Sequence, residues 1–327
     1  MTESIVWLIF IVVIGLLMAI DLGVFNKKAH IPNMAEALVT SSIWVLLGLS
    51  FSFFIYGAYE HHWFGLGSSR LESMDGWEAA LKYLTGYLLE LSLSIDNLFV
   101  MALVFAQLQV PRMYQHRILF WGIIGVIVFR GLLIAVGIAL VHRFESLFYV
   151  FGALLLYSAW KMLRHRHGED TDVHDHIAIR MIKRFYPVTR SHFRGRFFAR
   201  EQGRPAVTPL FVALLVVETT DIMFAFDSVP AVFSITTDPF LVFSSNIFAI
   251  LGLRSLYFLL ANVLDRFIYL KYSLIAILFY IGIKMILIPL HIYLPIGLSL
   301  GIIAGLLVLG IVFSLYSKPK ISAEAKI

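Results

Sequence analysis

Apolar residues gather along this chain in nine long runs that are separated by polar segments. A helix needs about 20 mostly apolar residues to cross a bilayer, and the runs reach that length. Such runs are too long and too continuously apolar for the strands of a membrane β-barrel. The sequence therefore predicts an all-α, polytopic membrane helix bundle. The expected spans are 5–25, 38–58, 80–106, 118–140, 144–163, 207–234, 240–263, 270–289 and 294–316.

Two connections between these spans are long, 59–79 and 164–206. In the second, apolar and basic residues mix over 177–185, which predicts a short helix on the membrane surface. Residues 197–208, with Gln202-Gly203 at their middle, predict a β-hairpin. The same connection holds a group of histidines that we expect to belong to a solvated loop rather than to a metal site. They are His165, His167, His174 and His176.

Composition and charge place the chain in a membrane and orient it. Hydrophobic residues make up 60% and charged residues 14%, whereas soluble domains are about one quarter charged. With the N-terminus outside, the inner segments carry 19 Lys and Arg and the outer segments carry three. Because positive loops stay in the cytoplasm, the N-terminus is expected outside and the C-terminus inside, in a bacterial inner membrane. The net charge of +5 then needs no nucleic-acid partner.

An internal repeat relates the third to fifth spans to the sixth to eighth. Asp96 pairs with Asp227, and Arg130 pairs with Arg254, at similar spacings along the chain. Because each copy has an odd number of spans, the copies are inverted, which is typical of transporters with a site between the repeats. We expect a single membrane domain with five parts. They are 1–79 (two spans and an outer loop), 80–163 (first repeat), 164–206 (basic cytoplasmic loop), 207–289 (second repeat) and 290–327 (ninth span and tail).

Acidic residues inside two spans carry the candidate chemistry. Aligned by the repeat, both spans read as an acid, five residues, Asp, and then Asn or Ser, with one further acid in the second. The residues are Glu90, Asp96 and Asn97 in the first span, and Glu218, Asp221, Asp227 and Ser228 in the second. Each intramembrane charge costs several kcal/mol or more, so these acids need partners. The available partners are protons, the buried bases Arg130 and Arg254, or a bound cation.

Helical geometry divides these residues between two faces. Residues seven apart share a face, which aligns Glu90 with Asn97 and Asp221 with Ser228. The two aspartates of the repeat lie off that face in an ideal helix. A kink at Pro230 would turn Asp227 inward. Because the two spans run antiparallel, Glu90 is expected near the level of Asp227.

The candidate ligands all present hard oxygen atoms, which suit magnesium, calcium or manganese. Cysteine is absent from the chain, so a thiolate metal site and a disulfide framework are both excluded. A purely structural interpretation pairs the acids with Arg130 and Arg254 to hold the bundle together. Two arginines cannot neutralise five acids, which favours a cation site.

At these motifs the chain resembles the TerC family of integral membrane proteins, and within it the Alx-type members. The resemblance rests on ELSLSIDN at 90–97, ETTDIMFAFDSVPA at 218–231 and SNIFAILGLRSLYFLLA at 245–261. It implies manganese efflux, tellurite resistance or metal supply to exported proteins. It also implies metal-site roles for the two acidic spans. Those residues are Glu90, Asp96, Asn97, Asp221, Asp227 and Ser228, with Glu218 as a further candidate.

The sequence favours a secondary exporter of a divalent cation; the resemblance implies Mn²⁺, and Ca²⁺ is the alternative ion. No phosphate-binding loop of the G-x-x-x-x-G-K-[ST] type occurs, so we expect no ATP-driven transport. Two alternatives share the same residues: a membrane partner that supplies metal to exported metalloproteins or secretion machinery, and an intramembrane aspartyl enzyme. The G-x-G-D segment typical of an intramembrane aspartyl enzyme is absent from the sequence. We therefore expect no enzymatic activity and no prosthetic group.

Overall fold

The structure is a computed structural model that describes residues 2–23, 33–67, 74–164, 187–189, 195–201, 204–260 and 269–316. All nine expected spans are helical over most of their length in this part of the chain. The α-helices are α1 (Thr2–Gly23), α2 (Met34–Glu60), α3 (Gly76–Gln107), α4 (Arg112–Arg143), α5 (Leu147–Arg164), α7 (Pro209–Phe233), α8 (Pro239–Leu251), α9 (Leu253–Leu260), α10 (Leu270–Leu287) and α11 (Ile296–Tyr316). Short 3₁₀ turns follow α2 and α10 at Trp63–Gly65 and Ile288–Leu290.

Six of the described helices are long and apolar enough to cross a membrane: α2, α3, α4, α7, α10 and α11. A seventh span results if the bent pair α8 and α9 is counted as one. The protein is therefore a polytopic helical membrane protein, as the sequence predicted. The total of nine spans and the orientation stay predictions, since α1 and α5 fall outside this set.

The expected span at 240–263 is broken rather than continuous. α8 ends at Leu251, Gly252 follows, and α9 begins at Leu253 with a bend of 40° between the two helices. Glycine is a poor helix former, which makes it a natural point for the break. Gly252 also lies against Trp44 of α2, 3.4 Å from its Cβ if a side chain were added. The bend therefore brings the backbone close to a neighbouring helix.

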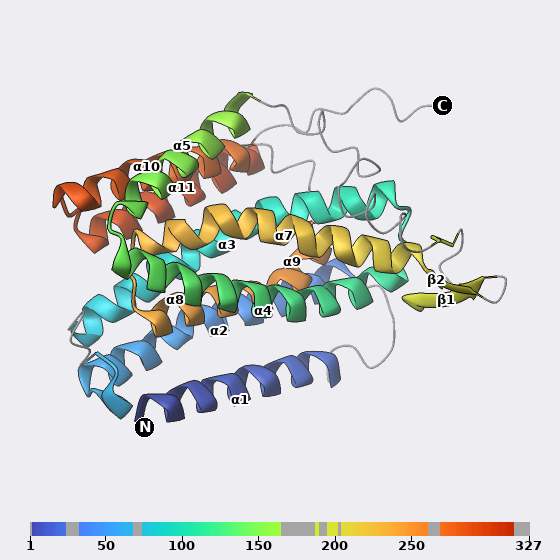
Figure 1. Cartoon of the computed structure of the whole chain (residues 1–327), viewed down its shortest axis with the longest axis horizontal. Helices are drawn as coiled ribbons and strands as arrows, with labels where there is room; N and C mark the ends of the chain where they lie inside the picture. The colour runs from blue at the N-terminus through green and yellow to red at the C-terminus, as the bar shows by residue number, and fades with distance from the viewer. Residues whose placement is uncertain are drawn as a thin grey trace.

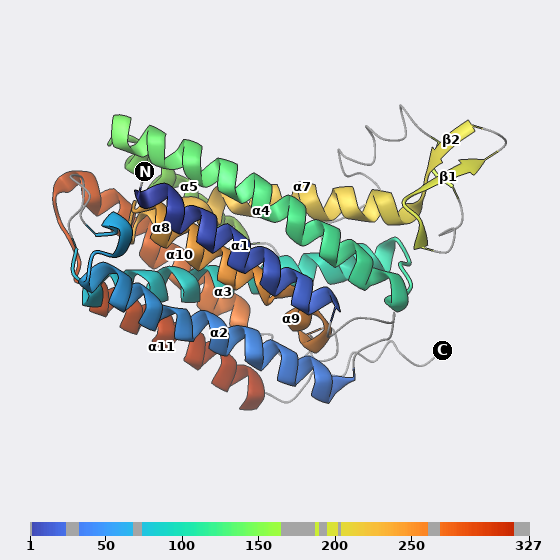
Figure 2. The same cartoon turned by 90° about the horizontal axis from the view of Figure 1, so that it is seen from below.

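The long helices lie side by side along one axis, with α3 in the middle of the bundle (Figures 1 and 2). α4 packs on α7, and their counterparts in the proposed repeat, α8 and α3, also pack on each other. α5 packs on its own counterpart, α10. Such reciprocal pairing is what two copies exchanged by a twofold axis would give, and it supports the inverted repeat.

Two glycines allow α5 and α10 to approach closely. A Cβ built on Gly152 would lie 2.9 Å from the carbonyl oxygen of Gly282, and one built on Gly282 would lie 3.2 Å from the carbonyl oxygen of Gly152. Small residues at helix crossings are how membrane helices gain contact, because lipid supplies no hydrophobic force between them. The two repeats therefore meet backbone to backbone at this crossing.

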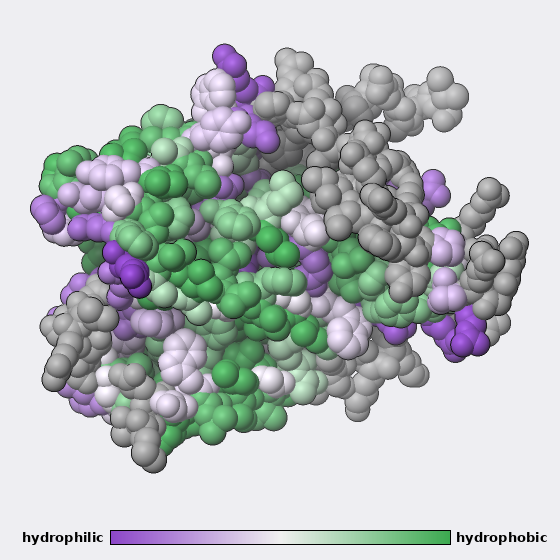
Figure 3. Space-filling view, in the orientation of Figure 1, coloured by the Kyte–Doolittle hydropathy of each residue, from purple (hydrophilic) through white to green (hydrophobic). Residues whose placement is uncertain are grey.

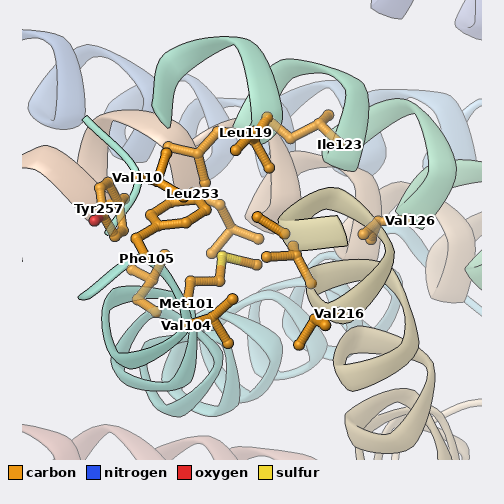
Figure 4. Close-up of a cluster of buried hydrophobic side chains, with 14 of the residues drawn as sticks. Met101, Val104, Phe105, Val110, Leu119, Ile123, Val126, Val216, Leu253 and Tyr257 are labelled. Carbon is orange, nitrogen blue, oxygen red and sulfur yellow. The ribbon is translucent and has the colours of Figure 1, made fainter. Parts of the chain in front are cut away.

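Buried apolar side chains fill the bundle in three clusters. Figure 4 shows one of them, in which Met101 and Phe105 of α3 pack near Leu119 of α4, Val216 of α7 and Leu253 of α9. Many large apolar side chains face outward instead, on α1, α2, α4 and α11 in particular. Hydrophobic surface covers the middle of the face in Figure 3. An apolar exterior is what a lipid-embedded protein presents.

The β-hairpin that the sequence predicted is present. β1 (Phe198–Glu201) and β2 (Arg204–Val207) pair antiparallel and project from one end of the bundle (Figure 1). The predicted surface helix at 177–185 and the four histidines of the same connection lie outside the described residues.

Candidate cation site

The polar faces of α3 and α7 meet in the interior of the bundle. Glu90 and Asn97 of α3 are 0% and 2% exposed, and Asp221 and Ser228 of α7 are 2% and 1% exposed. Their spacing of seven residues puts each pair on one side of its helix, as the sequence predicted. Removing these polar and charged groups from water is costly, so their partners decide what the site does.

Arg130 of α4 is the centre of this cluster. Its Nη1 donates hydrogen bonds to Glu90 Oε1, to Ser228 Oγ (3.1 Å) and to Asn246 Oδ1 (2.8 Å), and its Nε donates to Asp221 Oδ2 (3.3 Å). The guanidinium is 1% exposed. One arginine thus faces two carboxylates, and with both carboxylates ionised the cluster has one more negative charge than positive charges.

Asn97 completes the contact between the two helices. Its Nδ2 donates to Asp221 Oδ1 at 2.9 Å. Glu90, seven residues before Asn97, and Ser228, seven residues after Asp221, both contact Arg130. Residue numbers therefore rise along α3 as they fall along α7. The two helices run antiparallel, and Glu90 lies near the level of Ser228, the neighbour of Asp227, as expected.

Several buried oxygen atoms on this face of α3 make no hydrogen bond to any described residue. They are Glu90 Oε2, Ser94 Oγ and Asn97 Oδ1. They recur at four and seven residues from Glu90, so they line one side of the helix. Buried acceptors without a donor are rare and call for a specific explanation. Together with Asp221 they offer the hard oxygen ligands that a divalent cation prefers.

Glycines of α4 let α7 approach this cluster. A Cβ on Gly125 would overlap the carboxylate of Glu218, and a Cβ on Gly137 would lie 2.6 Å from the ring of Phe233. Arg130 lies between these two glycines in sequence. The close approach explains how a side chain of α4 reaches Asp221 of α7. Glu218 lies one helical turn before Asp221, is partly exposed, and contributes no bond to Arg130 among those described.

Asp96 and Asp227 face away from this cluster. Asp227 Oδ1 accepts a hydrogen bond from Ser158 Oγ of α5 (3.0 Å), and the charge of Lys271 at the start of α10 acts on Asp96. Both aspartates are partly exposed. Successive side chains on a helix point about 100° apart. Each aspartate precedes a residue of the cluster by one position, so its side chain is directed toward α5 or α10 instead of toward the cluster. The structure therefore separates the acids into a buried cluster and two flanking carboxylates.

The expected role of Pro230 in turning Asp227 inward is wrong for this structure. α7 is one helix through Pro230 to Phe233. Proline near the end of a helix removes only one donor, and the preceding turns hold the helix together. Asp227 contacts Ser158 of α5 instead.

The two arginines that the repeat pairs are placed differently. Arg254 is buried on α9, but it takes no part in the hydrogen bonds described for the cluster. The bend at Gly252 separates it from α8. Among the contacts described, Arg130 is the arginine that pairs with the acids.

Asn246 of α8 is the residue that sequence reasoning missed. It is fully buried, its Oδ1 accepts from Arg130, and its Nδ2 makes no hydrogen bond within the described part of the chain. It lies in the segment SNIFAILG that follows the acidic spans. An amide within an otherwise apolar run was the available signal.

The acids do not form a ready-made metal cage. Among the described residues, no three His, Asp or Glu side chains converge closely enough to hold a metal ion. Arg130 stands between Glu90 and Asp221 instead. A small pocket borders the cluster, and Asn97, Met101, Thr220 and Asp221 are part of its lining.

These features define the class of the protein: a polytopic helical membrane protein with a buried carboxylate cluster between its central helices. The chain belongs to the TerC family, since the profile of the "Integral membrane protein TerC family" matches residues 75–322. It is 44% identical over 309 residues to "Uncharacterized membrane protein STKORF319" of Myxococcus xanthus, covering 94% of this chain and 91% of that protein. It is 40% identical over 304 residues to "Putative membrane-bound redox modulator Alx" of Escherichia coli K12, covering 93% and 92%. No solved structure matches the chain.

Proposed function

We propose that this protein is a secondary transporter that exports a divalent metal cation across the bacterial inner membrane. The ion would be held by oxygen atoms of Glu90, Asn97, Asp221 and Ser228. Asp96, Asp227 and Glu218 would lie on the path of the ion, since each is acidic, partly exposed and close to the cluster in sequence. No catalytic role is assigned to any of them.

One observation carries this proposal: Glu90 Oε2 and Asn97 Oδ1 are buried acceptors without a hydrogen-bond donor in the described structure. Both flank Asp221, which Asn97 contacts directly. A cluster that only held the bundle together would be expected to satisfy its own acceptors. A bound cation would satisfy them instead, and water would be excluded by the burial of the site.

Manganese is the favoured ion on chemical grounds. Two carboxylates, an amide oxygen and a hydroxyl give a mixed oxygen set with moderate charge, which suits Mg²⁺, Ca²⁺ or Mn²⁺. Mg²⁺ dehydrates reluctantly and is seldom bound in an all-protein cage. The resemblance to a family associated with manganese efflux favours Mn²⁺ over Ca²⁺.

The relatives named as redox modulators suggest a second type of activity. This chain contains no cysteine, so an effect on redox state would not pass through one of its own thiols. Moving a redox-active metal such as manganese would alter redox conditions indirectly. The metal-transport proposal therefore agrees with that name.

Uptake into inverted membrane vesicles tests the proposal. Vesicles that contain the protein should accumulate Mn²⁺ in the presence of an ion gradient, and a panel with Mg²⁺, Ca²⁺, Zn²⁺ and Co²⁺ gives the selectivity. The matched control is Glu90→Gln, which keeps the size of the side chain and removes its charge. Equal uptake by the wild type, the variant and empty vesicles would contradict the proposed function.

A further inference from the structure

Arg130 occupies the place in which the proposed function puts a metal ion. Its guanidinium contacts Glu90, Asp221 and Ser228, which are three of the four residues that would supply ligands. The side chain is almost completely buried, so solvent does not screen its charge. A divalent cation and a guanidinium that compete for the same oxygen atoms repel each other. Binding of one therefore weakens binding of the other.

We propose, on the basis of the proposed function, that Arg130 is a tethered cation that substitutes for the transported ion. It fills the oxygen site when no metal is bound, and the arriving metal displaces it. The unloaded protein then changes conformation with Arg130 in place and needs no second ion to fill the site on its return.

The charge balance of the site explains why such a substitute is needed. Without Arg130, the empty site would hold two buried carboxylates, Glu90 and Asp221, and each uncompensated charge costs several kcal/mol inside a membrane protein. Arg130 reduces the excess to one negative charge. An empty site without this compensation would have to wait for protons or for another metal ion before the helices could move. Arg130 is therefore expected to permit net transport rather than only exchange of one metal ion for another.

Substitution of Asn246 tests the role of Arg130 independently. It holds Nη1 of Arg130 through its amide oxygen at 2.8 Å, and it adds no charge to the cluster. If Asn246 were itself a metal ligand, its removal would weaken metal binding. If it anchors Arg130 in the site, its removal would strengthen metal binding, because the competing cation would be held less firmly.

Metal binding by the purified protein in detergent provides the first test, with Mn²⁺ titrations followed by thermal melting. If Arg130 fills the site for about nine tenths of the time, Arg130→Gln should bind Mn²⁺ about tenfold more tightly. Asn246→Ala should shift affinity in the same direction by a smaller factor, and Arg130→Lys should stay near the wild type. Weaker or unchanged binding by folded Arg130→Gln would overturn the inference. If that variant does not fold, Asn246→Ala decides in the same way.

Transport in proteoliposomes provides the second test. Arg130→Gln should retain exchange of internal for external Mn²⁺ and lose net movement of Mn²⁺ into metal-free buffer, whereas Arg130→Lys should retain both. Net movement by Arg130→Gln at the wild-type rate, or equal loss of exchange and net movement, would overturn the inference. Failure of the wild type to bind or move any divalent ion would instead contradict the proposed function.

Discussion

Asn97 of α3 donates a hydrogen bond from Nδ2 to Oδ1 of Asp221 on α7 across 2.9 Å. The other oxygen of Asp221 accepts from Nε of Arg130. Asp221 therefore uses both oxygens in buried contacts, one with an amide and one with a charge. The partly exposed Asp227, six residues later on the same helix, accepts from the hydroxyl of Ser158. The two aspartates can therefore be compared by substitution, one inside the buried cluster and one outside it.

Asp221→Asn should abolish Mn²⁺-induced stabilisation and transport, while Asp227→Asn should lower transport but keep Mn²⁺-induced stabilisation. Asp221→Asn removes the charge-assisted hydrogen bond from Nε of Arg130 and leaves the guanidinium paired with Glu90, so it should also lower stability by about 2 kcal/mol. Asp227→Asn removes a partly exposed intramembrane charge and should leave stability within about 1 kcal/mol of the wild type. Melting of both detergent-solubilised variants with and without Mn²⁺ checks this prediction. Identical behaviour of the two would show that the division into cluster and flanking acids has no functional meaning.

Gly125→Ala should reduce transport and lower the melting temperature, because its methyl group would overlap the carboxylate of Glu218. Either Glu218 must move or α4 must shift away from α7, and overpacking of this kind costs about 1–3 kcal/mol. Gly15→Ala on α1 is the control, since a Cβ there has no neighbour within 4 Å. Transport assays and melting curves for both variants are the measurements. A normal Gly125→Ala protein would mean that the α4–α7 approach tolerates a wider spacing.

Reporters of membrane topology should place the segment after α2 and the C-terminal tail on opposite sides of the membrane. A fusion after Lys318 should report the cytoplasm, and a tag near Gly67 should be reachable from outside, because positive segments remain inside. Cleavage or labelling in intact cells measures both. Detection of the two positions on the same side would refute the nine-span topology.

Replacing the four histidines of the connection 164–206 together should leave metal transport within about twofold of the wild type, since a histidine-rich segment that is expected to be solvated need not bind metal for transport. The replaced residues are His165, His167, His174 and His176. Mn²⁺ efflux from cells, normalised to protein level, is the measurement. Loss of efflux at a normal protein level would make the loop a metal donor or acceptor.

The sequence by itself determined the membrane class, the positions of the helices and the buried faces of α3 and α7. Apolar runs of sufficient length leave the backbone no alternative to helix in a bilayer. Each expected range overlaps a described helix, except that the range 240–263 holds the bent pair α8 and α9. The seven-residue spacing of Glu90 and Asn97, and of Asp221 and Ser228, likewise follows from the geometry of a single helix. These are local properties, which a linear pattern contains in full.

Tertiary structure alone decided which charges meet. The repeat made Arg130 and Arg254 equivalent, yet Arg130 contacts both carboxylates, while the bend at Gly252 puts Arg254 on a separate helix. The packing of the helices also puts Asn246 beside Arg130 and Asp227 beside Ser158. The contacts of a long side chain depend on the spacing and rotation of helices far apart in sequence. That spacing is set by packing, here by glycines of α4 against α7, and the order of residues along one helix does not contain it.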